Sequence, residues 1–129
     1  MNLLYICYHN IARSQMAEAF SRKYYPDYKS RSAGVNVGKQ GDAVPFEVWE
    51  VMNDKGLDLK HHRRVKLNCG MVDSADKILV LCDKNECPDY LISSNKAEFW
   101  QVDDPVGGYD SMIAARDNIE EQVKNMFDE

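Results

Sequence analysis

Residues 2–13 read NLLYICYHNIAR, and this stretch decides the fold. Residues 2–7 form a largely apolar run typical of a buried strand, and residues 13–25 change to the spacing of an amphipathic helix. Cys7 therefore lies at the carboxyl end of a strand, and Arg13 lies where the next helix begins. A strand followed by a tight loop and a helix is the first half of a βαβ unit, which predicts an α/β fold.

The rest of the chain continues this alternation of strands and helices. Strands are predicted at 28–33, 76–82 and 99–102, and helices at 45–56 and 109–127. The run Ile78-Leu79-Val80-Leu81 is continuously apolar, as expected of a central strand covered on both faces. We expect one domain over residues 1–129, with a central four-stranded parallel sheet and helices on both faces.

The composition limits the class of protein. Hydrophobic residues make up 44% of the chain, which is enough for a packed core. The net charge of −5 argues against nonspecific nucleic-acid binding. No apolar run reaches the roughly 18–20 residues that cross a bilayer, and the first residues lack the features of a signal peptide. We therefore expect a cytoplasmic protein.

The chain contains four cysteines, at positions 7, 69, 82 and 87. In a chain without an export signal, such cysteines are catalytic, redox-active or inert rather than partners in structural disulfides. Cys82-x4-Cys87 is looser than the usual zinc chelate and no second pair has finger spacing, so neither a metal site nor a cofactor is predicted. We interpret Cys69 as a small apolar side chain.

The loop after Cys7 is suited to bind an oxyanion. Five backbone N–H groups can converge on one tetrahedral anion at the start of the helix and stabilise the Cys7 thiolate, those of Tyr8, His9, Asn10, Ile11 and Ala12. Arg13 adds a planar fork of donors, Ser14 can donate to the thiolate, and Asn10 tolerates left-handed backbone. Without a bound anion, Arg13 is unfavourably placed at the positive end of the helix dipole. A nucleotide P-loop is excluded because its G-x4-G-K-[ST] pattern is missing.

A family resemblance begins with residues 7–14, CYHNIARS. They resemble the C-x2-N-x2-R-S signature of the low-molecular-weight protein tyrosine phosphatases and of their relatives, the thioredoxin-coupled arsenate reductases. The continuation Gln15-Met16-Ala17-Glu18 is similar to the reductases in particular. Corresponding segments stand along nearly the whole chain, at Ser32-Ala33-Gly34, Gly56-Leu57-Asp58 and Asp103-Asp104-Pro105. The resemblance implies that the Cys7 thiolate attacks phosphate ester or arsenate held by the loop and Arg13.

In the reductase branch, the resemblance implies two further thiols. The second attacks the Cys7–arsenic adduct, which releases arsenite and leaves a disulfide, and the third carries the oxidation to the surface for thioredoxin. We assign these roles to Cys82, at the end of the apolar strand, and to Cys87, in a polar segment. A helix across residues 82–87 would separate the two Cα atoms by roughly 7.5 Å, beyond the limit of about 7 Å for a disulfide. We therefore expect this segment to be locally unstable.

In the phosphatase branch, a general acid must protonate the leaving group. Asp104, ahead of Pro105, matches the acid of that family, although turn chemistry alone also favours an aspartate there. The aromatic residues that flank a phosphotyrosine ring in the family are replaced by residues 106–108, VGG. Because Cys7, Cys82 and Asp104 each follow a predicted strand end, we expect them to face one crevice.

The resemblance, together with the two further thiols, favours a thioredoxin-coupled arsenate reductase. The alternatives are a phosphatase acting on phosphotyrosine protein or small phosphate esters, and a noncatalytic oxyanion or redox sensor. The basic cluster at residues 60–64, KHHRR, is typical of a solvated surface but can also attract oxyanions or an acidic partner. Glu18, Ser32 and Asp58 are candidates for a polar network that braces the loop from behind.

Overall fold

The structure is a computed structural model that describes residues 1–128. Its strands are β1 (Asn2–Cys7), β2 (Lys29–Gly34), β3 (Lys77–Val80) and β4 (Ala97–Phe99). Its helices are α1 (Arg13–Tyr24), α2 (Phe46–Asn53), α3 (Cys69–Ser74), the 3₁₀ turn η1 (Lys84–Glu86), α4 (Asp89–Ile92) and α5 (Tyr109–Asn125).

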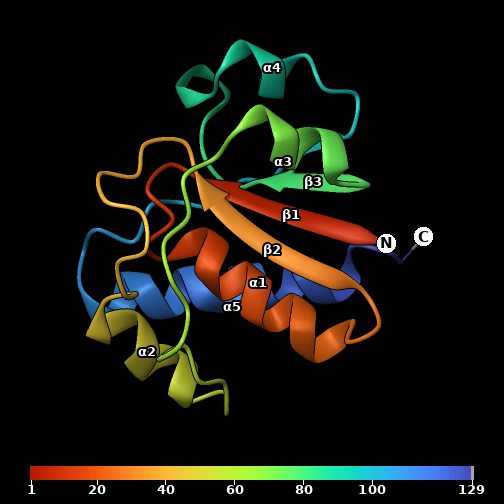
Figure 1. The fold of residues 1–129 in the computed structure, drawn as a ribbon. Helices are drawn as coiled ribbons and strands as arrows, with labels where there is room; N and C mark the ends of the chain where they lie inside the picture. The colour runs from red at the N-terminus through yellow and green to blue at the C-terminus, as the bar shows by residue number, and fades with distance from the viewer. Residues whose placement is uncertain (129) are drawn as a thin grey trace.

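The four strands form one parallel sheet in the order β2-β1-β3-β4. Helices cover both faces: α1, α2 and α5 lie on one side of the sheet, and α3 and α4 lie on the other (Figure 1). The predicted fold class is therefore confirmed. Because β1 is central and parallel to its neighbours, Cys7 lies at the carboxyl edge of the sheet, where ligands bind in folds of this kind.

The side chains of β1 alternate between two hydrophobic cores. Leu3, Tyr5 and Cys7 pack into the core beneath α1 and α5, and Leu4 and Ile6 pack into the core beneath α3. All five are buried. The strand that carries Cys7 is thus held on both faces, which gives the loop after it a rigid base.

The fourth strand is displaced from its predicted place. Residues 99–102 were expected to form it, whereas β4 spans Ala97–Phe99 and shares only Phe99 with that range. The ladder ends with a bond from the Trp100 N–H to the Val80 carbonyl. Beyond this point the Leu81 and Val102 carbonyls accept hydrogen bonds from Arg13 Nη1 instead of continuing the sheet.

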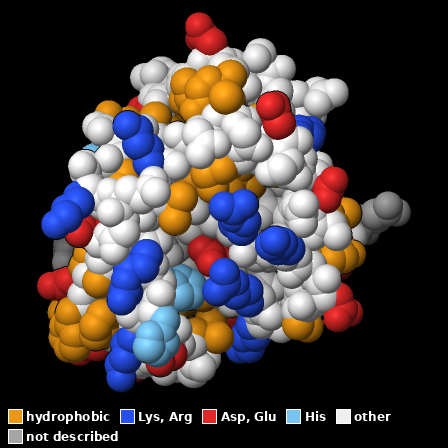
Figure 2. Space-filling model, viewed as in Figure 1, with side chains coloured by type: hydrophobic (Ala, Val, Ile, Leu, Met, Phe, Trp, Pro, Cys, Tyr) orange, Lys and Arg blue, Asp and Glu red, His pale blue; other side chains and the backbone are white. Residues whose placement is uncertain are grey.

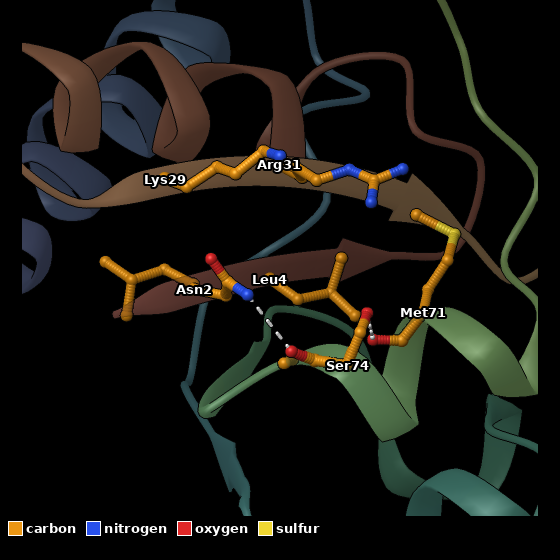
Figure 3. A pocket seen from close by; sticks show the side chains of 8 residues that line it. Asn2, Leu4, Lys29, Arg31, Met71 and Ser74 are labelled. Carbon is orange, nitrogen blue, oxygen red and sulfur yellow. Dashed lines mark hydrogen bonds between the residues drawn. The ribbon is translucent and has the colours of Figure 1, made fainter.

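Two short helices, α3 and α4, were not predicted because one or two turns show too little periodicity. The Asn68 side chain caps α3 by accepting from the Met71 N–H, a signal that the sequence does contain. A cavity of about 140 Å³ lies between α3 and the start of β1 and β2, and Asn2, Lys29 and Met71 line it (Figure 3). This cavity is at the opposite end of β1 from Cys7.

Candidate functional site

The Cys7 sulfur lies beside a hydroxyl group whose orientation is fixed. Cys7 Sγ and Ser14 Oγ are 2.9 Å apart, and both side chains are buried. Asn10 Nδ2 donates to Ser14 Oγ over 2.7 Å. Because Ser14 Oγ accepts from Asn10, its own hydrogen is available to the Cys7 thiolate, which is the role expected of Ser14.

Asn10 organises the loop between Cys7 and α1. Its φ of 55° confirms the expected left-handed backbone, and its side chain is fully buried. Oδ1 accepts from Gln15 Nε2 (2.9 Å) and from the Val65 N–H (2.8 Å), and these two donors identify the oxygen of the amide. Nδ2 therefore donates to Ser14 and, over 3.1 Å, to Ser32 Oγ.

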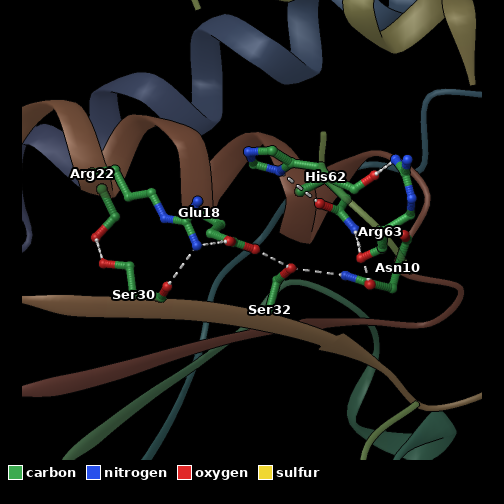
Figure 4. Close-up of polar contacts among 9 residues, drawn as sticks. Asn10, Glu18, Arg22, Ser30, Ser32, His62 and Arg63 are labelled. Carbon is green, nitrogen blue, oxygen red and sulfur yellow. Dashed lines mark hydrogen bonds and ion pairs between the residues drawn. The ribbon is translucent and has the colours of Figure 1, made fainter. Parts of the chain in front are cut away.

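A polar network extends behind the loop (Figure 4). Ser32 Oγ donates to Glu18 Oε1 over 2.5 Å, and Glu18 Oε2 pairs with Arg22. Glu18 and Ser32 thus belong to the bracing network, as expected. The Asp58 carboxylate instead accepts from the Lys60 N–H, so it caps a local turn.

Sequence reasoning missed the role of Gln15. Its Nε2 donates to the Asn10 carbonyl and to the Arg63 carbonyl, and its Oε1 faces His62 Nδ1 at 3.0 Å. Burial lowers the pKa of His62, and because Gln15 Oε1 can only accept, His62 Nδ1 is the donor of this hydrogen bond. The resemblance of residues 15–18 to the reductases was the one signal that pointed to Gln15.

The segment from Arg63 to Lys66 braces the loop from its outer side. Arg64 donates from Nε and Nη2 to the His9 carbonyl, over 3.3 and 3.0 Å. Because a trans peptide points its C=O and N–H in opposite directions, this contact turns the Asn10 N–H toward the inside of the loop. Gly34 allows the close approach, since a Cβ there would come within 2.8 Å of Asn10 N and His9 C.

Arg13 joins the loop to the two neighbouring strand ends. The residue is buried, and its Nη1 donates to the Leu81 carbonyl (2.7 Å) and the Val102 carbonyl (3.3 Å). The same side chain lines the crevice above Cys7. One arginine therefore connects the oxyanion loop with the segments that carry Cys82 and Asp104.

The crevice above Cys7 has a volume of about 290 Å³. Asp104 and Arg13 line it with the cysteine, and the rest of its wall consists of His9, Ile11, Ala12, Pro105, Val106 and Met112. Asp104 is exposed at the rim of the crevice. The structure thus brings together a thiol, a guanidinium and a carboxylic acid, as expected for Cys7, Arg13 and Asp104.

Cys82 does not face this crevice, and the expectation of three reactive side chains in one crevice was wrong. Cys7 packs with the core beneath α1, whereas Cys82 continues the alternation of Ile78 and Val80 into the core beneath α3. Cys82 also lines a separate cavity of about 360 Å³ between residues 81–84 and 99–102.

Cys82 and Cys87 form a second thiol site. Their sulfur atoms are 3.9 Å apart, Cys82 is buried and Cys87 is partly exposed. Residues 84–86 are a 3₁₀ turn with a capping box between Asp83 and Glu86, so no α-helix separates the two thiols. The expected unwinding is therefore unnecessary, because the turn already holds the sulfur atoms close together.

The two thiols differ in their surroundings. Burial is the largest cause that raises the pKa of Cys82; the nearby Cys87 and Cys7 raise this pKa further, and Arg13 lowers it. Burial also raises the pKa of Cys87. Because the charges of Cys7 and Arg13 act on Cys82, the second thiol site is electrostatically coupled to the oxyanion loop.

Within residues 1–128, no group of three or more His, Cys, Asp or Glu side chains is arranged to hold a metal ion. None of the helices in this range has the length and apolar composition that a bilayer crossing requires.

The fold and the loop define an enzyme that uses a cysteine nucleophile against an oxyanion or phosphate substrate. Residues 2–129 match the family model for "Low molecular weight phosphotyrosine protein phosphatase". The chain belongs to this family.

The chain is similar in sequence to arsenate reductases and similar in fold to a phosphatase of known structure. "Arsenate reductase 2" of Staphylococcus epidermidis is 31% identical over 127 residues, which cover 95% of this chain and 93% of the relative. "Arsenate reductase 2" of Staphylococcus haemolyticus is 29% identical over 126 residues, with the same coverage. The tyrosine phosphatase Wzb of Escherichia coli K30, solved with sulphate, has a TM-score of 0.86 at 23% identity and covers 97% of this chain and 94% of its own. This last likeness concerns the fold alone.

Proposed function

We propose that this protein reduces arsenate to arsenite and passes the resulting oxidation through Cys82 and Cys87 to thioredoxin. The observation that carries this proposal is the 3.9 Å separation of the Cys82 and Cys87 sulfur atoms. Hydrolysis of a phosphate ester requires one cysteine nucleophile and has no use for two more. A reduction that consumes two electrons requires a second thiol and benefits from a third.

The first steps take place at the loop. The Cys7 thiolate attacks arsenic, a Cys7–arsenic bond forms, and one arsenate oxygen leaves as water after protonation. The loop amides and Arg13 hold the remaining oxygens, and Ser14 stabilises the thiolate before attack. Cys82, which packs in the core beneath α3, must first turn toward the loop and release its proton, and its sulfur then attacks Cys7 Sγ. The electron pair of the broken sulfur–arsenic bond stays on arsenic, so arsenite leaves and a Cys7–Cys82 disulfide remains.

In the last steps, the disulfide is transferred from the Cys7–Cys82 pair to the Cys82–Cys87 pair. The Cys87 thiolate attacks Cys82 Sγ, expels the Cys7 thiolate and forms the Cys82–Cys87 disulfide. Since Cys87 is partly exposed, a dithiol of thioredoxin can attack there and restore both thiols. The compact turn at residues 84–86 supports this step because the two sulfur atoms need to approach by only about 2 Å to reach bonding distance.

A second candidate is a phosphatase acting on phosphate monoesters such as phosphotyrosine. It is favoured by the position of Asp104 in the same crevice as Cys7. There Asp104 would protonate the leaving oxygen and then activate water against the phosphocysteine. Val106 follows Pro105 and is 85% exposed, so the crevice has an aliphatic side chain on its rim at this point.

The two functions separate in a double assay. The protein is supplied with arsenate, thioredoxin, thioredoxin reductase and NADPH, and in parallel with p-nitrophenyl phosphate. We expect sustained NADPH consumption with arsenate. Cys87→Ser should abolish multiple turnover while a single stoichiometric reduction remains, because the Cys7–Cys82 disulfide still forms. Cys69→Ser is the matched control, since Cys69 is exposed on α3 and should leave turnover unchanged.

The reductase proposal fails if arsenate consumes no NADPH and the Cys82→Ala and Cys87→Ser variants keep full activity on the phosphate ester. That result would establish the phosphatase. A protein that binds phosphate at the Cys7 loop without turnover of either substrate would be an oxyanion sensor.

A further inference from the structure

A hollow of about 300 Å³ lies behind the oxyanion loop. Three separate parts of the fold line it: α1 contributes Glu18 and Arg22, β2 contributes Arg31, and the segment after α2 contributes His61 and Arg63. In Figure 2 the Lys and Arg side chains on this face gather around the histidines, with an acidic side chain between them. The hollow and the Cys7 crevice have no lining residue in common.

The positive charges of the hollow exceed its negative charge. The Glu18 carboxylate is already occupied, since Ser32 donates to one oxygen and Arg22 pairs with the other. Arg63 donates only to the backbone carbonyls of Lys60 and His62, and within residues 1–128 it has no carboxylate partner. Arg31 is exposed, and its side chain makes no hydrogen bond or ion pair in the same range; it lines both this hollow and the cavity beside α3.

Two guanidinium groups therefore remain without a counter-charge, on a chain whose net charge is −5. A metal cation is disfavoured here because three arginines surround the one carboxylate. Guanidinium groups instead offer paired N–H donors that match the oxygens of phosphate.

We propose that this hollow is a second oxyanion site, which binds a phosphate-class dianion through Arg31 and Arg63. Arg22 lies at the edge of the same hollow and keeps Glu18 neutralised. The floor of the site is connected to the catalytic loop, because Ser32 and Gln15 both bond Asn10, which bonds Ser14. The proposal does not depend on which reaction Cys7 catalyses.

The test is equilibrium dialysis of the full-length protein against radiolabelled inorganic phosphate at low ionic strength, where surface charges are least screened. The wild-type chain should bind two phosphates, one at the Cys7 loop and one in the hollow. Arg31→Ser should weaken the second site about tenfold, and a double change of Arg31→Ser with Arg63→Ser should remove it. Lys39→Ser makes the same charge change as Arg31→Ser outside the hollow and should leave both sites intact.

A separate measurement reports on the Cys7 loop. Phosphate should protect Cys7 from alkylation by iodoacetate equally well in the wild type and in the double variant. The proposal is overturned if the wild type binds a single phosphate, if the double variant still binds two, or if Lys39→Ser weakens binding as much as Arg31→Ser. Loss of protection at Cys7 in the wild type would instead contradict the proposed oxyanion loop, so the two failures are distinguishable.

Discussion

Replacement of Asn10 by alanine tests how the loop is held together. The change removes four hydrogen bonds, but three of the partners keep another contact: Ser14 retains Cys7, Ser32 retains Glu18, and Gln15 retains backbone carbonyls. Only the Val65 N–H loses its partner outright. Adding the cost of a left-handed alanine, we expect Asn10→Ala to lower the free energy of unfolding by about 4 kcal/mol.

Urea denaturation of Asn10→Ala measures this loss of stability, and comparison with Asn10→Gly separates the cost of the lost hydrogen bonds from the cost of left-handed backbone. Both variants lose the same hydrogen bonds, but glycine adopts a φ of 55° freely, so it should be more stable than the alanine variant by about 1 kcal/mol. Turnover should fall about a hundredfold in both, because Ser14 and the loop amides lose their alignment. The reasoning is refuted if Asn10→Ala costs less than about 1 kcal/mol, or if it is more stable than Asn10→Gly.

Three further predictions concern single positions. Gly34→Ala should destabilise the protein by about 1–3 kcal/mol in urea denaturation and lower turnover, because the added Cβ would lie 2.8 Å from the loop backbone. Gly38→Ala is the control: the space around Gly38 is open, so stability and turnover should both stay unchanged. Asp104→Asn should slow hydrolysis of p-nitrophenyl phosphate by about 10² or more and affect single-turnover arsenate reduction much less; equal losses in both assays would contradict its role as the acid. Burial raises the pKa of Cys82 above its ordinary 9.0. As the pH rises, the unfolded chain therefore releases the Cys82 proton before the folded chain does. The free energy of unfolding should then fall between pH 9.0 and 10.0, by at most about 1.4 kcal/mol per pH unit. Cys82→Ala should flatten that slope in denaturation curves, and an unchanged slope would mean that Cys82 does not contribute.

The sequence predicted the parts of the fold that depend on local pattern. The buried run at β1 and the amphipathic spacing of α1 placed Cys7 and Arg13 correctly at the two ends of one loop. The left-handed backbone of Asn10 followed from residue type and loop length. The spacing also indicated that Asp104 would reach the carboxyl edge of the sheet, which it does.

Long-range contacts could not be predicted in this way. The end of β4 is set by Arg13, which takes the Val102 carbonyl out of the ladder, and no pattern near residue 102 signals this. Arg64 and Val65 contact the loop from 55 residues away. The distance between Cys82 and Cys87 was estimated from the rise of a continuous helix, whereas only residues 84–86 form a 3₁₀ turn and Asp83 and Cys87 on either side of it are extended.

The most direct test of the proposed relay is one turnover without a reductant. The reduced protein is mixed with excess arsenate, the arsenite is counted, and the disulfides are mapped by mass spectrometry of proteolytic peptides. We predict one arsenite per chain and a disulfide that joins Cys82 to Cys87, with Cys7 recovered as a free thiol. Recovery of all four cysteines as thiols, with no arsenite formed, would contradict the account.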